Sequence, residues 1–159
     1  MTDATIHAAL SSAVADVLER MFFIEVQGGI AEPPLEIETV TARLTFDGDP
    51  PGDFQMRIAR RAADAVAADF LGEDAESLAD QQRTDVTLEL ANMICGAVLS
   101  RLESSACFRL GKPQIVDGDT GSQGWAGGTR YTVDTGRGPL TVAIRMEART
   151  CSPTEEYAS

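Results

Sequence analysis

The stretch Asp85-Val-Thr-Leu-Glu-Leu-Ala-Asn-Met-Ile-Cys-Gly-Ala-Val-Leu99 decides how this sequence is expected to fold. Apolar residues recur through it at spacings of three and four, and the pattern extends to both sides, which predicts an α-helix over 84–102. At about 100° per residue, the apolar side chains cover well over half of the helix circumference. Such a helix must be packed on most of its sides, so we expect other elements to surround it.

A narrow polar arc of this helix escapes the apolar pattern. Its members are Asp85, Glu89, Asn92, Gly96, Ser100 and Glu103. Glu89 and Asn92 are three residues apart, so their side chains are neighbours on one face. Asn and Gly are poor helix formers, costing roughly 0.5 and ~1 kcal/mol relative to Ala. A carboxylate and a carboxamide beside a side-chain-free notch form a candidate functional site. Spacing alone leaves open an exposed polar stripe with a glycine at a close helix crossing.

The flanking sequence predicts two further helices and several strands. On the N-terminal side the pattern favours a helix over 5–22, strand character over 22–26, a strand over 35–46, a turn over 47–52, a strand over 54–58 and a helix over 59–71 that ends at Gly72. On the C-terminal side it favours strands over 108–116, 129–134 and 140–148. Hairpin-length turns dominate, so the expected class is α+β: a largely antiparallel sheet with two long helices packed on it.

A faint internal repeat accompanies this pattern. The first helix carries Ser12, Asp16 and Glu19 at the same spacing as Asp85, Glu89 and Asn92 in the long helix. An internal duplication of a half-domain is therefore possible, although two amphipathic helices can share such a pattern by chance.

Length and charge restrict the class of protein. The 159 residues suit one domain, which we place at 1–149, followed by a polar C-terminal tail at 150–159. The formal net charge of −12 disfavours nucleic-acid binding, which needs a basic footprint. No apolar run approaches the ~20 residues that span a bilayer, and the first residues lack the features of a signal peptide. The expected location is cytoplasmic, with no membrane partner.

Several common site chemistries do not fit the sequence. His7 is the one histidine, and the three cysteines Cys95, Cys107 and Cys151 lack zinc-site spacing. The acidic turn that begins at Asp47 has Ile58 at its twelfth position, where a calcium loop needs a carboxylate. No helix follows the glycines of 118–128 to bind a phosphate. We therefore expect no metal site or cofactor of its own.

The run from Asp85 to Leu99 resembles the signature helix of the CheC/CheX/FliY family of chemotaxis phosphatases, in which Asp or Ser precedes Glu-x-x-Asn by four residues. The segments 44–56, 63–72 and 112–118 also resemble parts of that family. The length and the single Glu-x-x-Asn favour the CheX branch, because Asp16-Val-Leu-Glu19 stands where CheC-type members carry a second motif.

The resemblance implies a phosphatase for the aspartyl phosphate of a CheY-type response regulator, in chemotaxis or a related two-component circuit. Asn92 would orient the attacking water, and Glu89 would dock on the lysine of the receiver, which brings its own Mg²⁺. A carboxamide suits this task because it donates and accepts hydrogen bonds without titrating. The expected partner contacts are Asp85, Met93, Gly96 and Ser100, and the resemblance also implies a homodimer.

A non-catalytic alternative uses the same helix. An adaptor or flagellar-switch-like module could bind a receiver domain or another partner through it without hydrolysis. The intact pair of Glu89 and Asn92 favours catalysis, because an adaptor has no particular need for a helix-destabilising Asn beside a glycine. Which response regulator is bound, and whether the face of Ser12, Asp16 and Glu19 has a role, stay open at this point.

Overall fold

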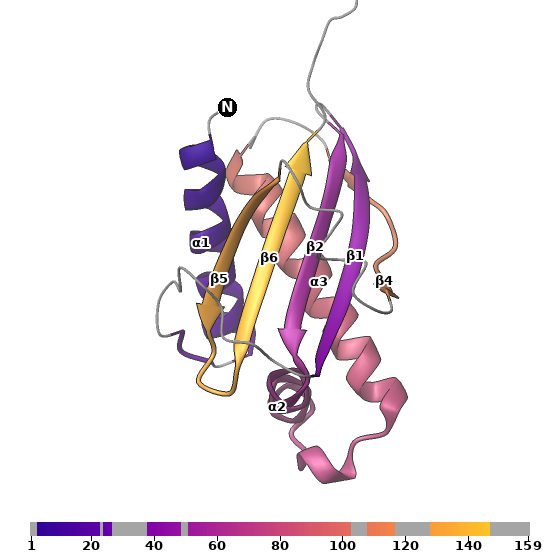
Figure 1. Cartoon of the computed structure of the whole chain (residues 1–159). Coiled ribbons are helices and arrows are strands. Elements are labelled where there is room, and N and C mark those ends of the chain that lie inside the picture. Colours follow the sequence, from indigo (N-terminus) through magenta and orange to yellow (C-terminus); the bar gives the residue numbers. More distant parts are fainter. Residues whose placement is uncertain are drawn as a thin grey trace, which may run out of the picture.

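A computed structural model describes residues 3–22, 24–26, 38–48, 51–102, 108–116 and 128–146. The helices and strands along the chain are α1 (Asp3–Met21), β1 (Thr39–Asp47), β2 (Gly52–Ala59), α2 (Arg60–Leu71), the 3₁₀ turn η1 (Ala75–Ser77), α3 (Asp80–Leu102), β3 (Arg109–Leu110), β4 (Gln114–Val116), β5 (Thr129–Asp134) and β6 (Pro139–Met146). The α+β class is confirmed, with α1 and α3 as the two long helices (Figure 1).

The sheet is antiparallel at every pairing among the described strands. Its order is β3-β1-β2-β6-β5, and β4 pairs with the same edge of β1 as β3 does. The predicted hairpin is confirmed, since β1 and β2 pair from Thr39 opposite Ala59 to Phe46 opposite Gly52. The second hairpin, β5–β6, joins the first through the β2–β6 pair. Because side chains alternate along each strand, one face of this sheet can be apolar throughout.

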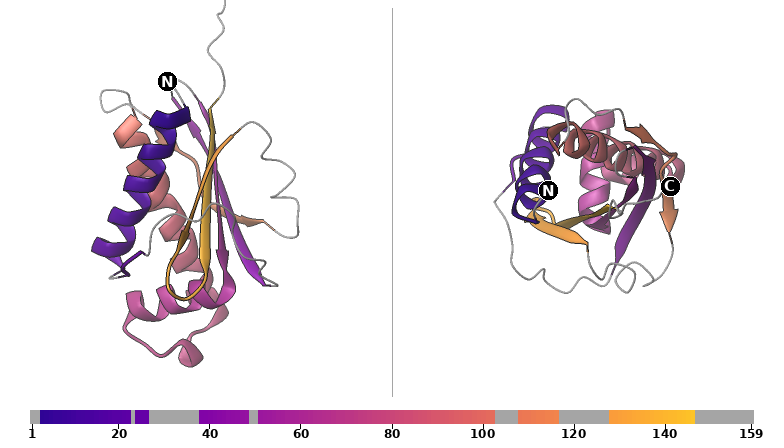
Figure 2. Two further views of the ribbon diagram at one scale, coloured as in Figure 1. Left: turned by 60° about the vertical axis from the view of Figure 1, so that its left-hand side comes forward. Right: turned by 90° about the horizontal axis from the view of Figure 1, so that it is seen from above.

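The long helices cover that apolar face side by side. Figure 2 shows α1 and α3 on the same side of the sheet, and α1 packs against both α3 and β5. Buried side chains from all three α-helices and from β1, β2, β5 and β6, together with Phe22 just after α1, form one core; its largest fully buried members include Leu10, Phe22, Phe54, Ile94 and Ile144. The expectation that α3 is packed on most sides is confirmed, because α1, α2 and the sheet all contact it. No helix in the described ranges combines the length and apolarity that a membrane crossing requires.

Two details of the expected secondary structure were wrong. Residues 24–26 form no strand: the N–H groups of Phe22 and Ile24 both donate to the Leu18 carbonyl, at 3.3 and 2.8 Å, which satisfies the end of α1. The expected strand 108–116 is divided into β3 and β4, because Gly111 bonds back to Thr45 and Pro113 has no N–H to donate.

Some helix and strand boundaries also moved. The helix expected from residue 84 begins at Asp80, and the strand expected from residue 35 is seen from Thr39, with 35–37 outside the described residues. The expected end of the last strand at 147–148 and the polar tail at 150–159 also lie outside them.

Gly72 ends α2, as predicted. Its φ of 68° is left-handed, and its N–H donates to the Ala68 carbonyl. This backbone conformation suits glycine because a side chain would crowd the following carbonyl. The stop allows the chain to turn through η1 and enter α3, which carries the candidate site.

Candidate functional site

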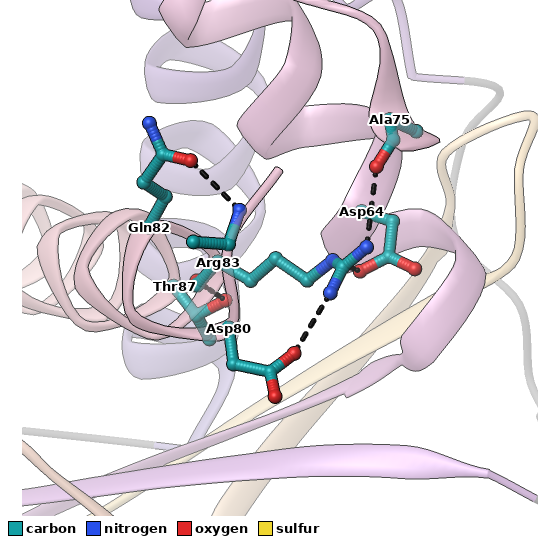
Figure 3. A network of polar contacts seen from close by, with 7 residues as sticks. Asp64, Ala75, Asp80, Gln82, Arg83 and Thr87 are labelled. Atoms are coloured by element: carbon teal, nitrogen blue, oxygen red, sulfur yellow. Dashed lines mark hydrogen bonds and ion pairs between the residues drawn. The ribbon is translucent and has the colours of Figure 1, made fainter. Parts of the chain in front are cut away.

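A network around Arg83 fixes the first turns of α3 (Figure 3). The guanidinium of Arg83 pairs with Asp64 of α2 through Nε at 3.0 Å and with Asp80 through Nη1 at 2.9 Å. Its Nη2 donates to the carbonyl of Ala75 in η1 at 3.2 Å, and the Thr87 hydroxyl donates to the Arg83 carbonyl at 2.8 Å. One arginine therefore links α3 to α2 and to the turn between them.

A second arginine fixes the last turns of α3 against α1. Arg101 donates to Ser12 Oγ at 3.1 Å and to Asp16 Oδ2 at 3.0 Å, while also contacting the Ala97 carbonyl. Asp16 pairs in addition with Arg20 at 2.8 Å. The polar face of the first helix thus has a structural role at Ser12 and Asp16, because both hold α3 in place.

Between these two anchors, α3 exposes the polar arc that the sequence singled out. Asp85, Glu89 and Ser100 are exposed, and Asn92 and Gly96 are half-buried. The carboxylate of Asp85 accepts a hydrogen bond from Gln81 Nε2 at 2.8 Å. Within the described part of the chain, neither the Glu89 nor the Asn92 side chain has a hydrogen-bond or ion-pair partner. Both are available to a molecule that docks on α3.

The remaining expected contact residues differ in exposure. Met93 is half-buried and packs against the core, so only part of its side chain can meet a partner. Glu103, at the end of the expected arc, lies outside the described residues.

Gly96 leaves a notch in the surface of α3, and no neighbouring helix packs closely enough there to exclude a side chain. A Cβ built on Gly96 would lie 3.9 Å from Leu110 Cδ2, an ordinary van der Waals distance, and no other described atom comes within 4 Å apart from its own helix neighbourhood. The alternative of a glycine at a close helix crossing therefore does not explain this residue. Leu110 comes from β3, so the notch lies where the edge of the sheet meets α3.

The arc offers a carboxylate and a carboxamide as its reactive groups. Glu89 can accept hydrogen bonds from a cation, and Asn92 can both donate to and accept from a water molecule.

Cys95, one turn before Leu99 on the inner side of α3, is buried, and desolvation raises the pKa of its thiol to about 12. A thiol in that state is no nucleophile near neutral pH. Across the described ranges no three His, Cys, Asp or Glu side chains cluster as metal ligands would.

Sequence reasoning did not identify the residues that support the arc. Arg83 and Arg101 act through partners on other helices, and Leu110 reaches Gly96 through the pairing of β3 with β1.

Sequence reasoning also missed a cavity of about 120 Å³ between α2, α3, β1 and β4, lined by charged residues that include Arg60 and Asp64. Its lining on α3 includes Thr84 and Thr87, on a different side of the helix from Glu89.

Comparison with known proteins points to one family. The family model described as chemotaxis phosphatase CheX matches residues 40–134, which is more than half of the chain and includes all of α3. A search of curated proteins found no match.

Solved structures share the fold over nearly the whole chain. The chemotaxis protein CheX from Vibrio vulnificus has a TM-score of 0.73 and 18% identity, covering 92% of this chain and 99% of its own. CheX from Desulfovibrio desulfuricans has a TM-score of 0.68 and 22% identity, covering 89% and 99%. The complex of CheX with CheY, BeF₃ and Mg²⁺ from Borrelia burgdorferi has a TM-score of 0.66 and 17% identity, covering 89% and 97%. At these identities the structures establish a shared fold.

Proposed function

The chain belongs to the CheX family of chemotaxis phosphatases, and from that premise we propose that it hydrolyses the aspartyl phosphate of a CheY-type receiver domain. The observation that carries the proposal is the pair Glu89 and Asn92. Both lie on the exposed arc of α3, both lack partners among the described residues, and the helix is anchored at each end by an arginine. A pair held this way is preorganised for a partner that docks along α3.

The proposed chemistry needs little from this chain beyond positioning. In-line attack forms a bond from the water oxygen to phosphorus and breaks the bond from phosphorus to the aspartate oxygen. The aspartate leaves as a carboxylate, and the proton of the water passes to the phosphate or to solvent. Asn92 orients the water by accepting from it and donating to it, and Glu89 pairs with the lysine of the receiver.

The metal of this reaction belongs to the partner in our proposal. The related complex from Borrelia burgdorferi contains CheY with BeF₃ and Mg²⁺. We assign Mg²⁺ to the receiver, where it neutralises the phosphoryl charge, and no cofactor to this chain. Asp85, Met93, Gly96 and Ser100 complete the docking surface around Glu89 and Asn92. The domain limits of 1–149 and the homodimer remain predictions.

Phosphate loss from a labelled receiver tests the proposal. We expect catalytic amounts of the protein, with Mg²⁺, to accelerate dephosphorylation of a CheY-type receiver from the same organism. Asn92→Ala should lower this acceleration about 100-fold while leaving the fold intact, because the residue positions the water from the helix surface. Gln114→Ala is the matched control: it removes an exposed carboxamide from β4, where Gln114 alternates with Ile115 and so belongs to the face of the sheet away from α3.

Two results would contradict the proposal. Full activity in Asn92→Ala would remove the assigned role of the carboxamide. Binding of several receivers without any acceleration would favour the adaptor.

A further inference from the structure

The edge of the sheet next to α3 carries a lysine in the segment that runs along this helix. Leu110 lies 3.9 Å from the Cβ position of Gly96, and Ile115 lines one cavity with Thr84 and Thr87 of α3. The chain from 110 to 115 therefore runs beside α3 from the level of Gly96 to that of Thr87. Asn92 lies between those levels.

Asn92 also lies on the flank of α3 that faces this edge. Asn92 and Gly96 are one helical turn apart and share a side of the helix. Leu110 approaches that side. The opposite flank is occupied by α1, through the bonds of Arg101 to Ser12 and Asp16, and Figure 2 shows α1 and β4 on opposite sides of α3.

Lys112 lies in this segment, between Leu110 and Ile115. It is the only lysine of the chain, it is exposed, and it has no hydrogen bond or ion pair with another described residue. Arg109 alternates with Leu110 along β3, so it belongs to the opposite face of the sheet. Lys112 is thus the cationic residue of the interruption between β3 and β4.

The backbone on both sides of Lys112 is fixed. The N–H of Gly111 donates to the Thr45 carbonyl at 2.7 Å, and a Cβ on Gly111 would lie 3.0 Å from that oxygen, so the chain is pressed against β1. Pro113 follows with a φ restricted by its ring. A lysine held between these residues loses less backbone entropy when a partner binds.

We propose that Lys112 is a docking residue that pairs with anionic oxygens at the rim of the receiver's phosphorylation site. The proposal rests on the function proposed above. With a net charge of −12 and with Asp85 and Glu89 on the docking arc, this chain would otherwise meet an acidic pocket with an acidic surface. An ammonium on the segment that runs along α3 offsets part of that repulsion. The oxygens belong either to the phosphoryl group or to carboxylates of the receiver.

Charge-reversal variants test this role in the full chain. Lys112→Glu and Arg137→Glu change the net charge equally, and Arg137 is exposed in the β5–β6 turn, remote in sequence and topology from the docking arc. We expect Lys112→Glu to raise the Kd for the receiver, and the KM for its phosphorylated form, about fivefold or more, with kcat within twofold. Arg137→Glu should change the Kd by less than about twofold. Lys112→Arg keeps the positive charge and should therefore bind the receiver as the wild type does. Thermal unfolding establishes that all variants fold.

The probe separates the two sources of anionic oxygen. Binding is measured to the receiver with Mg²⁺ alone and with Mg²⁺ and BeF₃⁻. If Lys112→Glu raises the Kd only when BeF₃⁻ is bound, Lys112 pairs with the phosphoryl oxygens. If it raises the Kd in both states, Lys112 pairs with carboxylates of the receiver. Either result supports the proposal. Equal binding by Lys112→Glu and Arg137→Glu overturns it, while Asn92-dependent hydrolysis by the wild type leaves the function standing. A wild type that neither binds the receiver nor accelerates its dephosphorylation overturns both.

Discussion

Gly96 occupies a helix position at which alanine would fit, since a Cβ there meets only Leu110 at 3.9 Å. We expect Gly96→Ala to raise the free energy of unfolding by about 0.5–1 kcal/mol, because alanine is the better helix former and constrains the unfolded chain. The same methyl group fills the notch beside Asn92, so receiver dephosphorylation should fall. Urea denaturation and the phosphate-release assay measure the two effects. A less stable Gly96→Ala would mean that the notch is required by packing.

The residues of the site differ in how far local sequence could predict them. Glu89, Asn92 and Gly96 break a strong apolar pattern within one helix, and that break is visible without any tertiary information. Arg83 and Arg101 look like ordinary surface cations in the sequence. Their roles depend on Asp64 and Asp16, which only the packing of α2 and α1 brings near.

At the scale of single elements, α2 offers a simple test of a left-handed cap. Gly72 has a φ of 68°, and a Cβ there would meet no described atom within 4 Å. Gly72→Ala should therefore lower the free energy of unfolding by about 1 kcal/mol through backbone strain alone. Gly72→Asn should cost less, because asparagine tolerates this conformation. Equal stability of the two variants and wild type, in urea denaturation, would contradict the role of the cap.

The elements that were predicted correctly are those with a complete local signal. The hairpin β1–β2, the helix α2 and the strand β5 each combine periodicity with a turn or a stop residue. The strand expected at 22–26 was wrong because Phe22 is fully buried just after α1, and Ile24 and Val26 pack, partly buried, against the same core. The break at 111–113 was missed because it depends on the bond from Gly111 to β1.

For the whole molecule, the excess of negative charge dominates the electrostatics. A net charge of −12 on 159 residues produces self-repulsion in the compact state, which salt screens. We expect the Tm to rise by a few degrees between about 10 mM and about 300 mM NaCl. Sodium sulfate at matched ionic strength is the control, because sulfate is also excluded from the protein surface and would raise the Tm further by that separate effect. A Tm that falls with NaCl would show that ion pairs such as Arg101–Asp16 outweigh the repulsion.

The order of the strands was the least predictable feature of the whole molecule. Antiparallel hairpins follow from short turns, so the class of the sheet could be predicted. The β2–β6 pair joins segments about 90 residues apart, and no local pattern specifies it. That pair is what unites the two hairpins under α1 and α3. The internal duplication suggested by the two helices stays a prediction.

The interruption between β3 and β4 also bears on how this protein avoids aggregation through the edge of its sheet. An unbroken edge strand beside β1 would present a regular row of free N–H and C=O groups, on which another strand could add and begin aggregation. Here the edge consists of two short strands, Pro113 contributes no N–H, and Lys112 is a charged residue at the gap. The same few residues that border the proposed docking surface thus make this edge a poor template for strand addition.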